Sequence, residues 1–160
     1  ETTGETSPGW GVDGCSAPNF ATTVHGLARA MARFAAASES GDSRQKAMHR
    51  LTRAMAAHPM MVAGKGRACT ELMEALDGRV AIKTGAEGVF VAIVPEKRMG
   101  IALKVCDGAS RASEAAVAAL LVKIGVLDPA HPAARKRMAP HLVNWRGIDT
   151  GETRLALGFA

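Results

Sequence analysis

Residues 79–106 read RVAIKTGAEGVFVAIVPEKRMGIALKVC and divide into three short runs rich in apolar and β-branched residues. Gly-containing or Pro-containing turns separate the runs, which cover residues 79–83, 88–94 and 99–106. This pattern predicts an antiparallel meander. In the first run, Val80 and Ile82 share one face of the strand, and Ala81 and Lys83 share the other. The second run is apolar on both faces, which indicates a central strand that is covered on both sides.

Helical periodicity precedes the meander. Apolar residues recur every three to four positions from residue 20 to residue 35, which predicts a helix. After a break at residues 38–42, Asp42 or Ser43 can cap a second helix, which His58-Pro59 ends. The apolar stripe of this second helix is Met48, Leu51 and Met55.

Further helices are expected on both sides of the meander. Upstream of it, Thr70 can cap a short helix that Asp77-Gly78 ends. Downstream, residues 110–124 are Ala-rich and predict a long helix. Its larger apolar residues can cover the sheet; they are Val117, Leu120, Leu121 and Ile124.

The remaining segments are less regular. Residues 1–19 are rich in Gly, Thr, Ser and Pro and predict a loop. Residues 128–140 are either irregular or hold one short helix, and residues 154–157 can add a strand. Together these elements predict an α+β fold in which an antiparallel sheet is flanked by helices.

Composition and charge narrow the function classes. Of the 160 residues, 48% are hydrophobic and 4% aromatic, which is enough for a core of small aliphatic side chains. The net charge of +5 permits attraction to anions. Because the densest basic cluster, at residues 135–137, has no aromatic residue close by, we expect no nucleic-acid partner. No apolar run reaches the roughly 18 residues of a membrane span, and we expect no membrane partner. Three scattered cysteines fit a reducing cytoplasm.

The triplet Lys83-Thr84-Gly85 ends the first strand of the meander. The same triplet occurs in serine β-lactamases and penicillin-binding proteins, where a lysine on a strand contributes positive charge to the active site. A lysine at a strand end is otherwise an ordinary solvated charge, and three residues alone leave that interpretation open. The context favours the first interpretation, because a meander and an Ala-rich helix follow the triplet in the order that this fold uses.

A second segment, GVDGCSAPNF at residues 11–20, places Asp13 two residues from Cys15 on a Gly-rich loop. Its simplest interpretation is a turn with small residues before a helix. A cysteine in this position can also be a thiolate or a metal ligand, although one cysteine falls short of the three or four ligands of a zinc site. Residues 43–46 also spell the SxxK of serine hydrolases, but we interpret Ser43 as a helix cap.

Four segments together resemble the asparaginase II family, which consists of bacterial amidohydrolases with a serine β-lactamase-like fold. They are GVDGCSAPNF at 11–20, AIKTGAEGVF at 81–90, GIALKV at 100–105 and NWRG at 144–147. The resemblance extends over nearly the whole chain but covers only the C-terminal half of the family's usual length. It implies that residues 1–160 are a single domain or the C-terminal half of a β-lactamase-like asparaginase, with the upstream half not present.

The resemblance implies conversion of L-asparagine to L-aspartate and ammonia through a serine acyl-enzyme. In the family, the nucleophilic serine and the lysine of its SxxK motif lie upstream of the position of Glu1. We therefore expect this chain alone to be inactive and to need the N-terminal half of the same protein or a homologous chain. A homodimer is also expected.

Individual site residues follow from the same resemblance. Lys83 matches the second active-site lysine, and Thr84 and Gly85 are expected to bind substrate, with Asp13 beside the site. Cys15 matches one of two cysteines that hold a zinc ion together with a lysine. Because the other ligands belong to the upstream half, zinc is possible but its site is incomplete in this chain. Two motif-bearing segments of one site must converge, so we expect Lys83 and Cys15 to face one cleft.

Two alternatives from other classes stay open. One is a non-catalytic fragment or interaction domain, since this chain lacks the nucleophile that the resemblance requires. The other is a basic domain that binds anions or nucleic acid, which the positive net charge permits.

Overall fold

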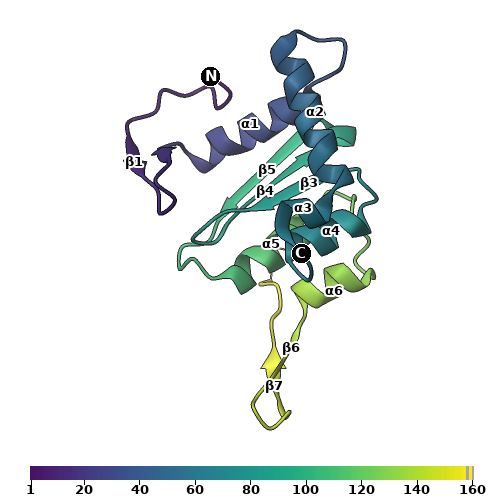
Figure 1. Ribbon diagram of the computed structural model, residues 1–160. Coiled ribbons are helices and arrows are strands. Elements are labelled where there is room, and N and C mark those ends of the chain that lie inside the picture. Colours follow the sequence, from purple (N-terminus) through teal and green to yellow (C-terminus); the bar gives the residue numbers. More distant parts are fainter. Residues whose placement is uncertain (158, 160) are drawn as a thin grey trace.

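The computed structural model describes residues 1–157 and 159 of the chain. Its centre is an antiparallel sheet with the strand order β3-β4-β5 (Figure 1). The strands are β3 (Ala81–Thr84), β4 (Val89–Val94) and β5 (Met99–Lys104). The predicted meander is therefore confirmed, and the second run forms the central strand.

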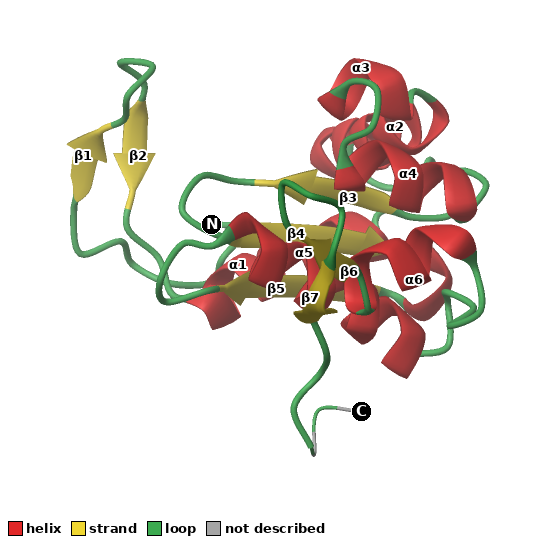
Figure 2. Ribbon diagram, turned by 90° about the horizontal axis from the view of Figure 1, so that it is seen from below, coloured by secondary structure: helices red, strands yellow, loops and turns green. Residues whose placement is uncertain are grey.

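Helices cover both faces of this sheet, as Figure 2 shows from below. In chain order they are α1 (Val24–Ala36), α2 (Ser43–Ala57), α3 (Pro59–Ala63), α4 (Ala68–Ala75), α5 (Ser110–Lys123) and α6 (Pro132–Met138). On one face, Ala81 and Ile93 pack with residues of α1 and α2. On the other face, Val80 and Ile82 join a larger core with residues of α4, α5 and α6. The predicted α+β class and the alternation along the first strand are confirmed.

The helix starts show which cap predictions were right. Thr23 caps α1, because its hydroxyl oxygen accepts a hydrogen bond from the Gly26 amide at 2.9 Å. Asp42 caps α2 by accepting from the Gln45 amide at 2.8 Å. Ser43 is therefore the first helical residue, and its interpretation as the cap is wrong.

Two predicted details of the helices are corrected by packing. Leu51 does not lie on the buried stripe of α2 but is 57% exposed, and the buried residues of that helix are Met48, Thr52 and Ala56. Thr70 does not cap α4 but lies inside it. Its hydroxyl donates to the Gly64 carbonyl at 2.6 Å, which ties α4 to the end of the unforeseen helix α3.

Two hairpins were not foreseen. Strands β1 (Trp10–Val12) and β2 (Pro18–Phe20) form an antiparallel pair in the segment predicted as loop. The pair extends to Phe20, where the first helix was expected to begin, and α1 starts only at Val24. Strands β6 (His141–Val143) and β7 (Asp149–Glu152) form another, and the strand predicted at residues 154–157 is absent. All residues of these four strands are exposed, and both hairpins stand away from the central sheet (Figure 1). The short helix expected within residues 128–140 is present as α6.

An ion-pair cluster joins the three helices on the larger core. Arg137 of α6 lies 2.5 Å from Glu71 of α4 and 2.8 Å from Glu114 of α5, and Lys136 lies 2.6 Å from Glu71. Burial alone would raise the pKa of Glu71, but the hydrogen bonds and charges of Lys136 and Arg137 outweigh it and lower that pKa. Since the folded-state pKa is below the ordinary value, the cluster stabilises the fold at neutral pH. That contribution is lost as pH falls through the lowered pKa.

Helix α1 packs closely against β5 at Gly100. A Cβ added to Gly100 would lie 2.2 Å from the carbonyl oxygen of Ala28 and 2.2 Å from the amide nitrogen of Ala32. Both are backbone atoms of α1, which cannot swing aside as the end of a side chain can. The sheet therefore accepts α1 in this position only because residue 100 has no side chain. None of the described helices is long and apolar enough to cross a membrane.

We predict that Gly100→Ala lowers the free energy of unfolding by about 2–3 kcal/mol, because the new methyl group must push α1 away from β5. Gly9→Ala is the matched control, since an added Cβ there meets nothing within 4 Å, and its change should stay within about 0.5 kcal/mol. Urea unfolding followed by circular dichroism measures both. Equal stability of the two variants would contradict the close packing of α1 on β5.

Candidate functional site

The triplet Lys83-Thr84-Gly85 lies at the end of β3, which is an edge strand of the central sheet. The Lys83 side chain is exposed, and its Nζ atom donates to the Thr84 carbonyl at 2.7 Å. The expectation that Lys83 lies at the end of an antiparallel strand is therefore confirmed. The lysine charge stands at the sheet edge, where a ligand lying along the strand can reach it.

The backbone amides of this segment point in two directions, either toward the neighbouring strand β4 or away from it. The Gly85 amide donates to the Val89 carbonyl at 2.8 Å and so points toward β4. Because amides alternate in direction along a strand, the Thr84 amide points out of the sheet. It donates there to the sulfur of Cys69 on α4, at 3.2 Å. Helix α4 thus covers one outward amide of the edge, next to the exposed Lys83.

Cys69 is therefore the cysteine that touches the triplet, and sequence reasoning had assigned it no role. It is 1% exposed, and burial raises the pKa of its thiol, while the Thr84 amide and the charges of Lys83 and Arg67 act in the opposite direction. A thiol with a raised pKa is neutral at pH 7 and a poor nucleophile. Cys69 consequently acts as a hydrogen-bond acceptor that positions the strand. Nothing in the spacing around residue 69 signals this contact, because it depends on how α4 packs against β3.

The Cys15 motif lies in the loop between β1 and β2. The Cys15 thiol donates to Asp13 Oδ2 at 3.9 Å, and Asp13 Oδ1 accepts from the Gly14 amide at 2.7 Å. Both side chains are exposed. Among the residues that the structure describes, no hydrogen bond or ion pair joins this loop to Lys83, Thr84 or Gly85. The structure therefore brings Lys83, Thr84 and Cys69 together, and it places Cys15 on a separate hairpin. That Cys15 and Lys83 face one cleft stays a prediction.

The residues around Cys15 do not by themselves fit a zinc ion. Within residues 1–157 and 159, there is no group of three His, Cys, Asp or Glu side chains that could hold a metal. Cys15 and Asp13 provide one sulfur and one carboxylate, whereas zinc in proteins takes three or four protein ligands. A complete zinc site therefore needs further ligands besides Cys15 and Asp13.

The larger cavities lie away from the triplet. One of 530 Å³ lies between the end of α1 and the start of α2, and another of 540 Å³ is lined by residues of α2, α3 and α4. Lys83, Thr84 and Cys15 line neither of them. The exposed Lys83 therefore lies outside both of these cavities.

An α+β fold with an exposed lysine on an edge strand is compatible with an amidohydrolase that binds its substrate beside a sheet. The sequence profile described as L-asparaginase II matches residues 1–155. The chain therefore belongs to the L-asparaginase II family, and its family-level activity is that of an asparaginase-type amidohydrolase. A search of curated proteins finds no match to the chain.

We predict that Cys69→Ala lowers the free energy of unfolding by about 1–3 kcal/mol, because the Thr84 amide then loses its acceptor. Cys69→Ser should cost less, since a hydroxyl oxygen can accept the same bond. Cys106→Ala is the control, because Cys106 is exposed and its removal should change stability by no more than about 0.5 kcal/mol. Chemical unfolding of the three variants checks this. A Ser variant as unstable as the Ala variant would argue against the hydrogen bond.

Proposed function

We propose that this protein hydrolyses L-asparagine to L-aspartate and ammonia through a serine acyl-enzyme. The observation that carries the proposal is the match of the L-asparaginase II family over residues 1–155. The exposed Lys83 at the end of an edge strand supports it, because a cation in this position can act on a substrate bound along the strand.

The nucleophilic serine and the lysine of its SxxK motif are supplied from outside residues 1–160 in this proposal. Their source is the N-terminal half of the same protein or a homologous chain, which completes a β-lactamase-like fold. Residues 43–46 are not proposed to supply them, because they follow the Cys15 motif in the chain, whereas the SxxK of the family precedes it. Residues 1–160 alone then release no ammonia from asparagine.

The chemistry is an acyl transfer in two steps. A serine hydroxyl is a weak nucleophile near pH 7, and a neutral lysine beside it can take its proton. Positive charge on Lys83 favours the neutral form of that second lysine and attracts the developing oxyanion. The serine oxygen attacks the side-chain amide carbon of asparagine, the C–N bond breaks and ammonia leaves with a proton. Water then attacks the ester, which releases aspartate and restores the serine.

Thr84 and Gly85 are proposed to bind the substrate at the strand edge. The Thr84 hydroxyl lies 3.2 Å from the Gly85 carbonyl and 3.4 Å from the Val89 carbonyl. It is therefore held by the turn in this structure and has to rotate to donate to a substrate carboxylate. A side chain at residue 85 would also crowd the turn, because an added Cβ would lie 3.1 Å from Cβ of Val89.

We further propose that Cys15 is one zinc ligand, completed by donors outside residues 1–160, with Asp13 beside the site. The supporting observation is that both side chains are exposed on a hairpin loop, where further donors can approach. A homodimer in a reducing cytoplasm is also part of the proposal, and three free cysteines are compatible with it.

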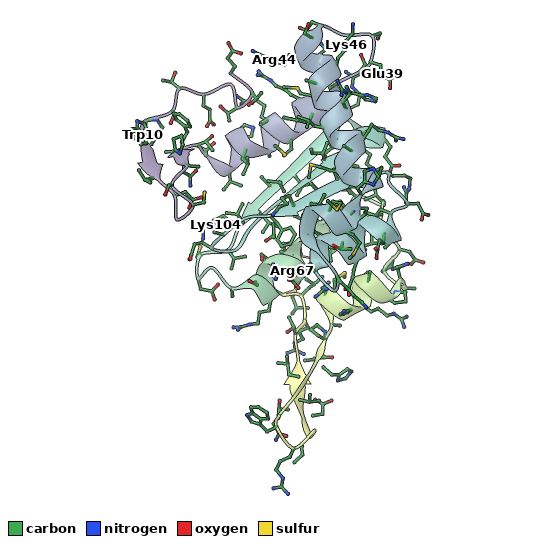
Figure 3. All side chains as sticks on the ribbon, viewed as in Figure 1. Trp10, Glu39, Arg44, Lys46, Arg67 and Lys104 are labelled. Carbon is green, nitrogen blue, oxygen red and sulfur yellow. The ribbon has the colours of Figure 1, made fainter. Side chains whose placement is uncertain are left out.

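With the upstream half restored, we predict that Lys83→Met lowers kcat at least about 100-fold, the scale expected for a group that acts in the transition state. Lys104→Met is the matched control. Lys104 also ends a strand of the central sheet and donates from Nζ to the carbonyl of the next residue, at 2.6 Å (Figure 3 labels it). Ammonia release from asparagine measures both. An unchanged rate in Lys83→Met would reduce Lys83 to a surface charge.

We predict that residues 1–160 alone bind zinc weakly, because a thiolate and a carboxylate cannot enforce tetrahedral coordination. Adding the upstream half should tighten binding, and Cys15→Ser should abolish that gain while Cys69→Ser and Cys106→Ser retain it. Zinc titration against a competing chelator measures this. Tight stoichiometric binding by residues 1–160 that persists in Cys15→Ser would place the metal on other residues.

A further inference from the structure

A cavity of 530 Å³ lies where the end of α1, the start of α2 and the turn before β5 meet. Three guanidinium groups line it: Arg33 from the last turn of α1, Arg44 from the first turn of α2, and Arg98 from the turn. Its volume is in the range of small-molecule sites. One acidic residue, Asp42, also lines it. Its carboxylate already accepts from the Gln45 amide as the cap of α2, so the cavity carries an excess of positive charge.

A carboxylate of the chain already interacts with this cluster. Arg44 forms an ion pair with the side chain of Glu1, and Arg33 donates to the main-chain carbonyl of Glu1. The hydrogen bond from Arg44 and its charge lower the pKa of the Glu1 carboxyl. Both side chains of this ion pair are largely exposed, at 61% and 74%, so the pair is exchangeable. Arg44, which lines the cavity, is therefore positioned to pair with a carboxylate, and a free anion would compete with Glu1 for it.

Arg98 adds a further positive charge to the cavity, beside the ion pair of Arg44 with Glu1. Among the residues that the structure describes, Arg98 has no acidic partner. It follows the 3₁₀ turn η1 (Pro95–Lys97) and adopts a left-handed backbone conformation with φ of 50°. A non-glycine residue in this region is uncommon and strained. The turn therefore holds an unpaired guanidinium at the cavity at some conformational cost.

The charges around the start of α2 are divided between its sides. Figure 3 shows Arg44 on the side of α2 that faces the N-terminal segment, with Lys46 and Glu39 on the other side. Neither Lys46 nor Glu39 lines the cavity. The three arginines come from separate elements, and guanidinium groups suit the paired oxygens of phosphate or carboxylate.

We propose that this cavity is a binding site for a small oxyanion, with the Glu1 carboxylate as its intramolecular competitor. Inorganic phosphate and a dicarboxylate such as aspartate share this chemistry. Arg33 and Arg44 hold one end of the anion and Arg98 holds the other. The proposal is independent of the hydrolytic function, because it concerns residues away from Lys83 and is tested by binding.

The test is calorimetric titration of residues 1–160 with inorganic phosphate, and separately with L-aspartate, at low ionic strength and pH 7.5. We expect saturable one-site binding of at least one of the two anions, and the preferred anion identifies which source the site takes. Arg98→Gln should weaken that binding about tenfold, as expected for the loss of one charge-assisted hydrogen bond. Glu1→Gln should tighten it roughly two- to fivefold by removing a competing surface ion pair.

Arg50→Gln is the matched control. Arg50 is exposed on the same helix α2, and its removal changes the net charge equally, but it does not line the cavity. It should leave the affinity within about twofold, since a distant exposed charge is largely screened. Thermal unfolding confirms that each variant is folded. Absence of saturable binding of both anions, equal weakening by Arg98→Gln and Arg50→Gln, or an unchanged affinity in Glu1→Gln would each overturn the proposal.

Discussion

The contact between the backbone of α1 and Gly100 of β5 fixes the position of the first helix, and much of the molecule depends on it. Ala28 and Ala32 lie so close to Gly100 that α1 cannot slide or roll without main-chain atoms colliding. The end of α1 is thereby held near the turn that precedes β5. Arg33 and Arg98 come from these two places, and both line the same cavity. The packing that closes one face of the sheet therefore also assembles the cationic cavity.

The opposite face of the sheet is covered by larger side chains, and part of the β3 edge stays exposed. Leu72 and Met73 of α4 are fully buried in the core that contains Val80 and Ile82. The same helix carries Cys69, which accepts the outward Thr84 amide. Lys83 points to the other side of the strand and stays exposed. The strand is thus held in place by α4 on one side, and the Lys83 charge stays exposed on the other.

Much of the fold could be predicted from the sequence because burial imposes a period on it. The meander, α1 and α5 each have a face that must be apolar, and their patterns are visible in the chain. The two hairpins escaped prediction because every residue of their strands is exposed, so no buried face forces an alternation. The error at Leu51 has a related cause, since small residues of α2, such as Ala56, pack against the sheet where a larger apolar residue was expected.

The candidate site was predictable in its residues but not in its arrangement. Lys83 could be found because the triplet ends a strand whose pattern is clear, and its position follows from that strand. Cys15 could be found in the same way, but the strands of its hairpin have no buried residue, and even the large side chains of the paired Trp10 and Phe20 are exposed. A two-stranded hairpin of this kind is marginally stable alone in water. The sheet therefore fixes where Lys83 lies, whereas the place of Cys15 relative to Lys83 depends on whatever packs against the hairpin.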